Sequence, residues 1–276
     1  MAPDTDADRG TEVGALVPTI TRNGVELAYE EHGAGEPAML LLHGMACVHE
    51  HMAPLVEAFA PDHRCVAFDL RGHGASGVPH DAYSADEFTT DIGFAIDELG
   101  LDRPVLIGHS FGGSVSLIFA RAHPERIRAL VMLDSGLRSR ATIGADLNPF
   151  YDALRAATPE QYRVIVEEFC MTRLFDPVDD QVMARQIAQQ MAQVPAHVFL
   201  SMAATVTAFD SADTARACTV PSLIIQSCQP FVDPVELATL PSNWHEGRVV
   251  GAGHFIQLLA PDQVVPMVRR FLELVG

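Results

Sequence analysis

The sequence contains no lysine, and all 18 of its basic residues are arginine. Without lysine the chain cannot form a Schiff base with a carbonyl substrate or with pyridoxal phosphate, and it has no P-loop lysine to hold a nucleotide phosphate. The 36 acidic residues outnumber the arginines and leave a formal net charge of −18. Nucleic acids and anionic membranes are bound by positive protein surfaces, so we expect neither as a partner.

Cysteine and long apolar runs are also scarce. The five cysteines are odd in number and scattered, and no two form a C-x-x-C pair. This pattern argues against a disulfide framework or a zinc cluster and favours reduced, mostly buried thiols.

No run approaches the roughly 18 apolar residues of a transmembrane helix, and the acidic N-terminus lacks the apolar region of a secretory signal. We therefore expect a cytoplasmic protein with a disordered acidic tail over residues 1–16.

Strand-like and helix-like patterns alternate along most of the remaining chain. Strand-like runs lie at residues 18–22, 26–31, 38–42, 64–69, 104–108, 129–133, 222–227 and 248–250. The four runs between 38 and 133 are apolar throughout, as expected of parallel strands that are covered on both faces. Helical patterns at 84–99 and 112–122 separate some of them, and a last helix is expected at 261–275. The alternation predicts βαβ units with right-handed crossovers.

The pattern changes in the middle of the chain, where strand signals stop. Four helix-like stretches follow one another at residues 149–156, 159–175, 178–193 and 196–209. We therefore predict an all-helical insert, residues 137–217, between the sixth and seventh strands, and a core formed by residues 17–136 and 218–276. Such an insert could cover the carboxyl edge of the sheet, where open α/β sheets bind ligands.

The strongest single motif lies directly after the fifth expected strand. Gly108-His109-Ser110-Phe111-Gly112 is a G-x-S-x-G sequence between a strand and a helix. The turn is so sharp that side chains at positions 108 and 112 would collide with neighbouring backbone, and it leaves the hydroxyl of Ser110 exposed at a helix N-terminus. A dinucleotide site would instead need G-x-G-x-x-G in the first βα turn. The pattern predicts Ser110 as a nucleophile.

Three further segments complete a resemblance to the α/β-hydrolase fold family. The sequence L-H-G-M-A at 42–46 resembles the family's oxyanion loop, and F-D-L-R-G-H-G-A-S at 68–76 resembles its D-x-R-G-x-G-x-S loop. Gly253-His254-Phe255 looks like its catalytic histidine turn. The likeness spans about residues 18–275. It implies a doubly wound, mostly parallel sheet of eight strands, with a helical cap between the sixth and seventh strands.

The resemblance also implies roles for individual residues. The backbone N–H groups of Met45 and Phe111 would form the oxyanion hole, and His254 would act as the general base. No metal or cofactor is implied. His43 and His109 occupy motif positions where the ring usually supports the loops. The H-E-H sequence at 49–51 gives no credible three-ligand metal set, although its histidines could line a pocket.

The acidic member of the triad is where the sequence departs from the family pattern. The usual position, after the seventh strand, falls on Gln229 or Pro230, and neither can orient an imidazole as a carboxylate would. Asp233 follows a few residues later and looks like the N-cap of a helix. Asp134 ends the sixth strand, and some branches of the fold, among them certain dehalogenases and ring-opening lactonases, use an acid there. We favour Asp134 and keep Asp233 as the alternative.

Together these features predict a serine hydrolase that cleaves a carboxylic ester or lactone through an acyl-enzyme on Ser110. The large apolar side chains of Met45 and Phe111 indicate a small-molecule substrate with an apolar portion. A haloalkane dehalogenase or epoxide hydrolase of this fold would need Asp at position 110. A carbon–carbon bond hydrolase and a non-catalytic ligand receptor that retains the triad remain alternatives.

The insert carries large apolar residues that could either pack between its helices or line the pocket. They are Met171, Phe175, Met183, Met191, Phe199, Met202 and Phe209.

Overall fold

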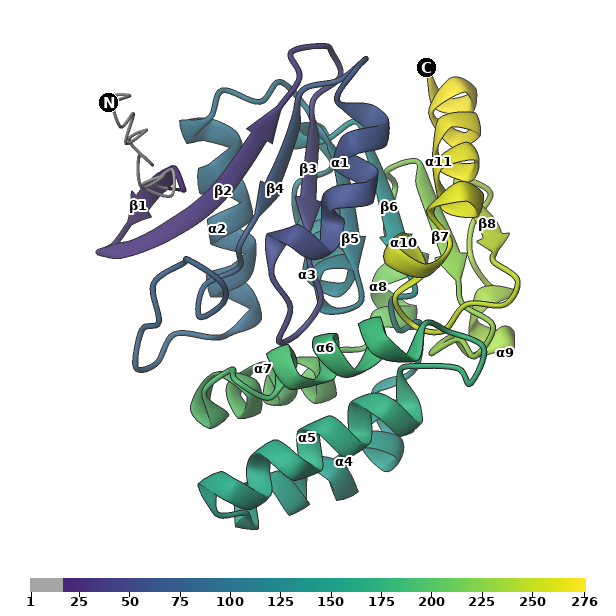
Figure 1. Ribbon diagram of the computed structural model, residues 1–276. Helices are drawn as coiled ribbons and strands as arrows, with labels where there is room; N and C mark the ends of the chain where they lie inside the picture. The colour runs from purple at the N-terminus through teal and green to yellow at the C-terminus, as the bar shows by residue number, and fades with distance from the viewer. Residues whose placement is uncertain (1–16) are drawn as a thin grey trace, which may run out of the picture.

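The computed structural model describes residues 17–276, without the side chains at positions 141 and 143, and centres on one eight-stranded sheet (Figure 1). The strands are β1 (Thr19–Arg22), β2 (Val25–His32), β3 (Met39–Leu42), β4 (Cys65–Phe68), β5 (Val105–His109), β6 (Ala129–Leu133), β7 (Ser222–Gln226) and β8 (Trp244–Arg248). Their spatial order is β1-β2-β4-β3-β5-β6-β7-β8. β2 pairs antiparallel with β1 and β4, and all the other neighbours are parallel, which confirms the predicted sheet. The expected tail, residues 1–16, lies outside the described residues.

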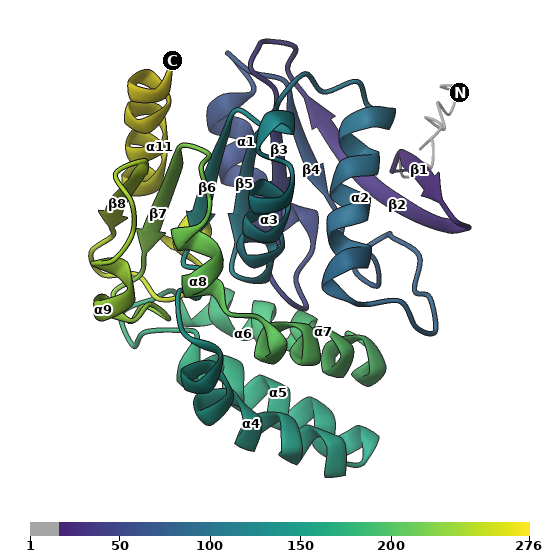
Figure 2. The ribbon, with the colours of Figure 1, turned by 180° about the vertical axis from the view of Figure 1, so that it is seen from behind.

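Helices cover both faces of this sheet. On one face lie α1 (Ala53–Phe59) and α11 (Pro261–Val275), and on the other lie α2 (Ala85–Glu98), α3 (Phe111–Ala122) and α8 (Ser211–Arg216) (Figures 1 and 2). Every residue of β3 to β7 is buried, because apolar side chains from both faces of the strands pack into separate cores beneath the two helix layers. All five cysteines are free thiols, and four are buried, as expected.

The helical insert forms a layer across one end of the sheet. It contains α4 (Arg140–Ala156), α5 (Pro159–Arg173), α6 (Gln181–Met191) and α7 (Ala196–Ala208), after which α8 returns to the sheet (Figure 1). The prediction placed the first helix nine residues too late, at Pro149. Ser139 is the true N-cap, since its side chain accepts the Thr142 N–H, and Pro149 lies inside the helix. α8, six residues long, was missed. The boundaries of core and cap stay predictions.

Strand β8 was predicted at the wrong residues. We expected it at 248–250, where two valines follow each other, but the structure pairs Trp244–Arg248 with β7. β8 is an edge strand whose residues are half-buried or exposed, so it carries no apolar run for a sequence pattern to detect. The last helix, 261–275, was predicted correctly.

Several short elements complete the fold. They are the 3₁₀ helices η1 (His49–Met52) and η2 (Pro124–Arg126) and the short helices α9 (Pro234–Leu237) and α10 (Ile256–Leu259). Within residues 17–276, no helix combines the length and the apolar character needed to cross a bilayer.

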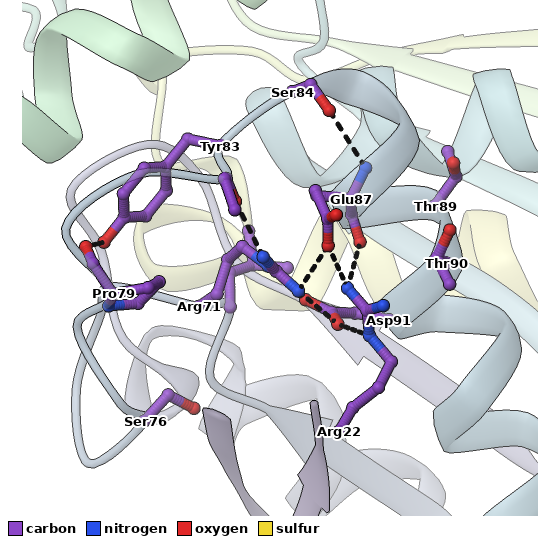
Figure 3. A network of polar contacts seen from close by, with 12 residues as sticks. Arg22, Arg71, Ser76, Pro79, Tyr83, Ser84, Glu87, Thr89, Thr90 and Asp91 are labelled. Carbon is purple, nitrogen blue, oxygen red and sulfur yellow. Dashed lines mark hydrogen bonds and ion pairs between the residues drawn. The ribbon is translucent and has the colours of Figure 1, made fainter. Parts of the chain in front are cut away.

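A buried ion-pair network joins the sheet edge, the loop after β4 and helix α2 (Figure 3). Asp91 on α2 accepts two hydrogen bonds from Arg71, at 2.6 and 2.7 Å, and one from Arg22 of β1, at 2.5 Å. Glu87, one turn earlier, pairs with both guanidinium groups. Asp91 and Arg71 are almost fully buried, at 1% and 2% exposure. Two carboxylates thus neutralise two guanidinium groups whose burial would otherwise be costly.

We expect Asp91→Asn to lower the free energy of unfolding by about 3–5 kcal/mol, because it leaves buried guanidinium charge without its partner. Equilibrium urea unfolding measures this loss. Asp97→Asn is the matched control on the same helix, since Asp97 pairs with Arg126 at the surface and should contribute at most about 1 kcal/mol. Equal losses in the two variants would contradict the conclusion that the buried ion pairs stabilise the fold more than the exposed pair does.

Candidate active site

Ser110 occupies a sharp turn between β5 and α3. Its backbone has φ 51° and ψ −115°, a region that non-glycine residues rarely adopt. A Cβ atom at Gly108 would lie 2.4 Å from the Gly113 nitrogen, and one at Gly112 would lie 2.4 Å from the Leu42 carbonyl oxygen. The backbone can approach so closely only because both positions are glycine. The turn therefore presents Ser110 at the N-terminus of α3.

His254 and Asp134 form a buried pair at the same edge of the sheet. His254 Nδ1 lies 2.7 Å from Asp134 Oδ2, and Asp134 is fully buried. The other carboxylate oxygen of Asp134 accepts the Ser227 N–H at 2.8 Å, which fixes the plane of the carboxylate. The backbone N–H of His254 donates to the Leu174 carbonyl at 2.7 Å. With Nδ1 held by Asp134, the Nε2 atom is the ring nitrogen left for proton exchange.

The alternative acid, Asp233, lies elsewhere and has another role. It is the N-cap of α9, as its sequence context suggested, and its side chain accepts the Val235 N–H at 2.9 Å. Gln229, one of the two residues expected at the usual acid position, the other being Pro230, donates to Asp176 at 2.9 Å. Among the described residues, the structure therefore brings Asp134, and neither Asp233 nor Gln229, to the imidazole of His254.

A cavity of about 130 Å³ opens onto this pair and onto Ser110. Met45 and Phe111 also line it, so all five predicted site residues meet in one place. The remaining walls are mostly apolar and come largely from the helical insert, including Leu147, Phe150, Tyr151, Phe169, Met191, Phe199, Val206 and Phe209. Of the insert residues considered from sequence, three line the cavity (Met191, Phe199 and Phe209) and four do not (Met171, Phe175, Met183 and Met202).

Several cavity residues were missed by the sequence analysis. Arg138 lies four positions after Asp134, so its place just beyond a strand end could have identified it. Phe150, Phe169 and Phe231 carried no such signal, because which face of a helix or loop points inward depends on tertiary packing.

The backbone around the cavity leaves two N–H groups free. Within the described chain neither the Met45 N–H nor the Phe111 N–H donates to a protein acceptor. Phe111 is the first residue of α3, and the first N–H groups of a helix have no acceptor within it. The loop that carries Met45 is held by the Ala46 N–H, which donates to His73 Nε2 at 3.1 Å. Both free donors are available to an oxyanion.

Two buried histidines brace these loops in their neutral form. His43 Nε2 accepts the Leu70 N–H at 3.0 Å, and burial, reinforced by the neighbouring His73, lowers the pKa of His43 to about 3. His109 Nε2 lies 3.0 Å from the carbonyl oxygen of His254, and burial holds the pKa of His109 well below its usual value. A neutral ring nitrogen can donate or accept, so His43 links its loop to the loop after β4, and His109 links the end of β5 to the His254 turn, without adding charge.

His49 of the H-E-H segment on η1 forms an ion pair with Asp69, which lies in the loop after β4. His49, Glu50 and Asp69 place possible metal-ligand atoms within 4.8 Å of one another. However, both oxygens of Asp69 already accept backbone N–H groups, from His49 at 2.7 Å and from Ala75 at 2.9 Å. His51 turns away and lies 3.0 Å from Gln190 of α6. Neither histidine of the segment is among the residues that line the cavity.

The charge state of His49 follows from this ion pair. Its Nδ1 atom lies 3.0 Å from the Asp69 carboxylate. Burial alone lowers the pKa of His49, but the carboxylate of Asp69, helped by two nearby glutamates, outweighs burial and raises that pKa to about 9. His49 is therefore protonated in the folded protein near neutral pH.

We expect this pair to stabilise the protein in a pH-dependent way. The folded-state pKa of about 9 lies above the unfolded value of 6.5, so the stabilisation is complete below about pH 6.5 and is lost as the pH rises through about 9. Urea unfolding of the wild type and of His49→Gln between about pH 6 and pH 10 tests this. The difference in unfolding free energy should shrink with rising pH, and a constant difference would refute the assignment.

Comparison with known proteins adds to this geometry. A protein of Azorhizobium caulinodans named as a carbamate hydrolase is 29% identical over 260 residues, which cover 92% of this chain and 98% of that protein. The 2-(acetamidomethylene)succinate hydrolase of Mesorhizobium japonicum is 26% identical, with 99% of both chains covered. The enol-lactonase of Burkholderia xenovorans LB400 has the same fold, with a TM-score of 0.80 at 23% identity over 93% of this chain and all of that one. A family model described as the alpha/beta hydrolase fold matches residues 37–261. Since that match takes in most of the sheet and the whole insert, this chain belongs to the α/β-hydrolase fold family.

Proposed function

We propose that the protein is a serine hydrolase that cleaves a carboxylic ester or lactone through an acyl-enzyme on Ser110. The observation that carries the proposal is the 2.7 Å contact between His254 and the fully buried Asp134, beside a cavity that also holds Ser110 at a strained turn. Two relatives that match over nearly their full length are named as hydrolases, which supports the same class of chemistry.

In this mechanism His254 takes the proton of the Ser110 hydroxyl through Nε2 while the Ser110 oxygen attacks the substrate carbonyl. Asp134 holds the imidazole in the required tautomer and stabilises the imidazolium that forms. The N–H groups of Met45 and Phe111 stabilise the oxyanion, and one such donor typically contributes about 3 kcal/mol. His254 then protonates the leaving alcohol, and a water molecule, activated in the same way, releases the acid.

The walls of the cavity indicate the size and character of the substrate. The volume of about 130 Å³ and the mostly apolar lining suit a small acyl group or ring. Residues 137–217, the proposed cap, supply most of the large apolar side chains of this lining and would therefore determine specificity. The substrate partner we propose is a small molecule.

The first test is covalent labelling with a fluorophosphonate probe followed by peptide mapping, in which Ser110 should carry the label and Ser110→Ala should carry none. Turnover is then measured on a panel of short-chain 4-nitrophenyl esters, lactones, carbamates and a 1,3-diketone. Multiple turnover of esters or lactones supports the proposal. Label at another residue, or turnover confined to the carbamates or to the diketone, would overturn it.

The role of the acid is tested separately. We expect Asp134→Asn to lower kcat by about 10⁴-fold, because the amide no longer holds His254 in the productive tautomer. Asp233→Asn is the matched control and should turn over normally, since Asp233 only caps α9. Steady-state kinetics on one ester compare the two variants, and loss of turnover in Asp233→Asn alone would transfer the role to Asp233.

A further inference from the structure

Arg138 is a positive charge, unexpected from the sequence, in a mostly apolar cavity. It follows β6 by a few residues and is the one arginine among the described residues that line the cavity, in a chain that has no lysine. The guanidinium group stays protonated at every physiological pH. Its side chain is only 19% exposed, so it is largely shielded from water.

The hydrogen bonds of Arg138 leave part of the guanidinium unused. Nη1 donates to Asp146 Oδ2 of α4 at 2.8 Å. Within the described chain Nε and Nη2 have no acceptor, so N–H donors remain for a ligand. The group lies 5.5 Å from the centre of the Phe231 ring, and that ring lies 5.1 Å from the imidazole of His254. Arg138 is thus separated from the proposed base by one aromatic side chain.

The charge of Arg138 is not balanced by its partner. Asp146 also accepts a hydrogen bond from Arg173 at 2.9 Å. Burial raises the pKa of Asp146, but the two guanidinium groups outweigh it and lower that pKa, so the carboxylate is ionised. Two guanidinium groups share one carboxylate, which leaves a net charge of +1 on this cluster, and Arg138 is its member that lines the cavity. The carboxylate that lines the cavity, Asp134, is held by hydrogen bonds from His254 and Ser227 and is not the partner of Arg138.

The backbone of Arg138 is fixed before any ligand binds. Its N–H donates to Ser211 Oγ at 2.9 Å, and the same hydroxyl donates back to the Arg138 carbonyl at 3.1 Å. The preceding residue, Leu137, donates to the Phe231 carbonyl at 3.2 Å and pairs with Val232 in an isolated parallel bridge. With the backbone fixed in this way and Nη1 held by Asp146, the guanidinium group loses little conformational entropy on binding.

We propose that Arg138 binds a free carboxylate on the substrate, so that the preferred substrates are esters or lactones carrying a second, anionic carboxylate group away from the reacting carbonyl. The inference rests on the proposed function and narrows its substrate class. A guanidinium fork matches the two oxygens of a carboxylate. The net charge of +1 on the cluster of Arg138, Asp146 and Arg173 is matched by one such monoanion, whereas a phosphate dianion would leave uncompensated negative charge in a mostly apolar cavity.

The test compares two esters with the same six-carbon acyl chain, 4-nitrophenyl hexanoate and the mono-4-nitrophenyl ester of adipic acid, which ends in a carboxylate. The measured quantity is the ratio of kcat/KM for the anionic ester to that for the neutral one. We expect Arg138→Gln to lower this ratio by about 10- to 100-fold, as for loss of a hydrogen bond to a charged group. Arg138→Lys should lower it less, because it keeps the charge but loses the fork.

Arg140→Gln is the matched control. Arg140 lies two residues further on, is exposed and does not line the cavity, so the same change in net charge should leave the ratio unaltered. An unchanged ratio in Arg138→Gln, or equal losses in both variants, would overturn the proposal.

Binding gives a second readout that does not depend on turnover. Monomethyl adipate, a monoanion with a neutral ester end, should raise the melting temperature of Ser110→Ala more than methyl hexanoate does, and Arg138→Gln in that background should abolish the difference. If neither 4-nitrophenyl ester is hydrolysed but monomethyl adipate still protects through Arg138, the proposed reaction fails while the carboxylate site stands. Hydrolysis of both esters with no Arg138-dependent preference or protection leaves the reaction in place and overturns the carboxylate site.

Discussion

The site depends on how closely the backbone packs around the turn at Ser110. Gly112 allows the first turn of α3 to lie against the end of β3, since a Cβ there would sit 2.4 Å from the Leu42 carbonyl oxygen. This approach brings the loop that carries Met45 beside Ser110. Gly113 does the same toward β6, where a Cβ would lie 1.9 Å from Ser135 Oγ, next to Asp134. Two adjacent glycines thus set the distances from the nucleophile to both neighbouring strand ends.

Several buried charges in this acidic protein are paired with groups of opposite charge. The guanidinium of Arg71 is neutralised by carboxylates of α2, and His49 is neutralised by Asp69. The histidines that brace the loops are kept neutral by burial. The cluster of Arg138, Asp146 and Arg173 differs, because its two guanidinium groups share one carboxylate and because Arg138 lines the cavity where a substrate would lie.

The cap and the sheet contribute different things to the site. The sheet edge supplies Ser110, Asp134 and His254 from turns whose backbone is held by neighbouring strands, which suits groups that must keep fixed distances. The helices of the insert supply most of the apolar walls, where the shape of the cavity can change without moving the proposed catalytic groups. This separation explains how one fold can carry out hydrolysis on different substrates.

The sequence by itself determined the strands and site residues that can be recognised from a few neighbouring residues. The apolar runs of β3 to β6, the G-x-S-x-G turn and the glycine-flanked His254 each follow from a few neighbouring residues. It could not locate β8, because an edge strand is recognised by its pairing and not by apolar side chains. Only the tertiary structure decided which carboxylate meets the imidazole, since Asp134 and His254 are 120 residues apart and meet because the strands that precede them end at one edge. The inward direction of Arg138 was decided in the same way, by packing between segments that the sequence does not show to be neighbours.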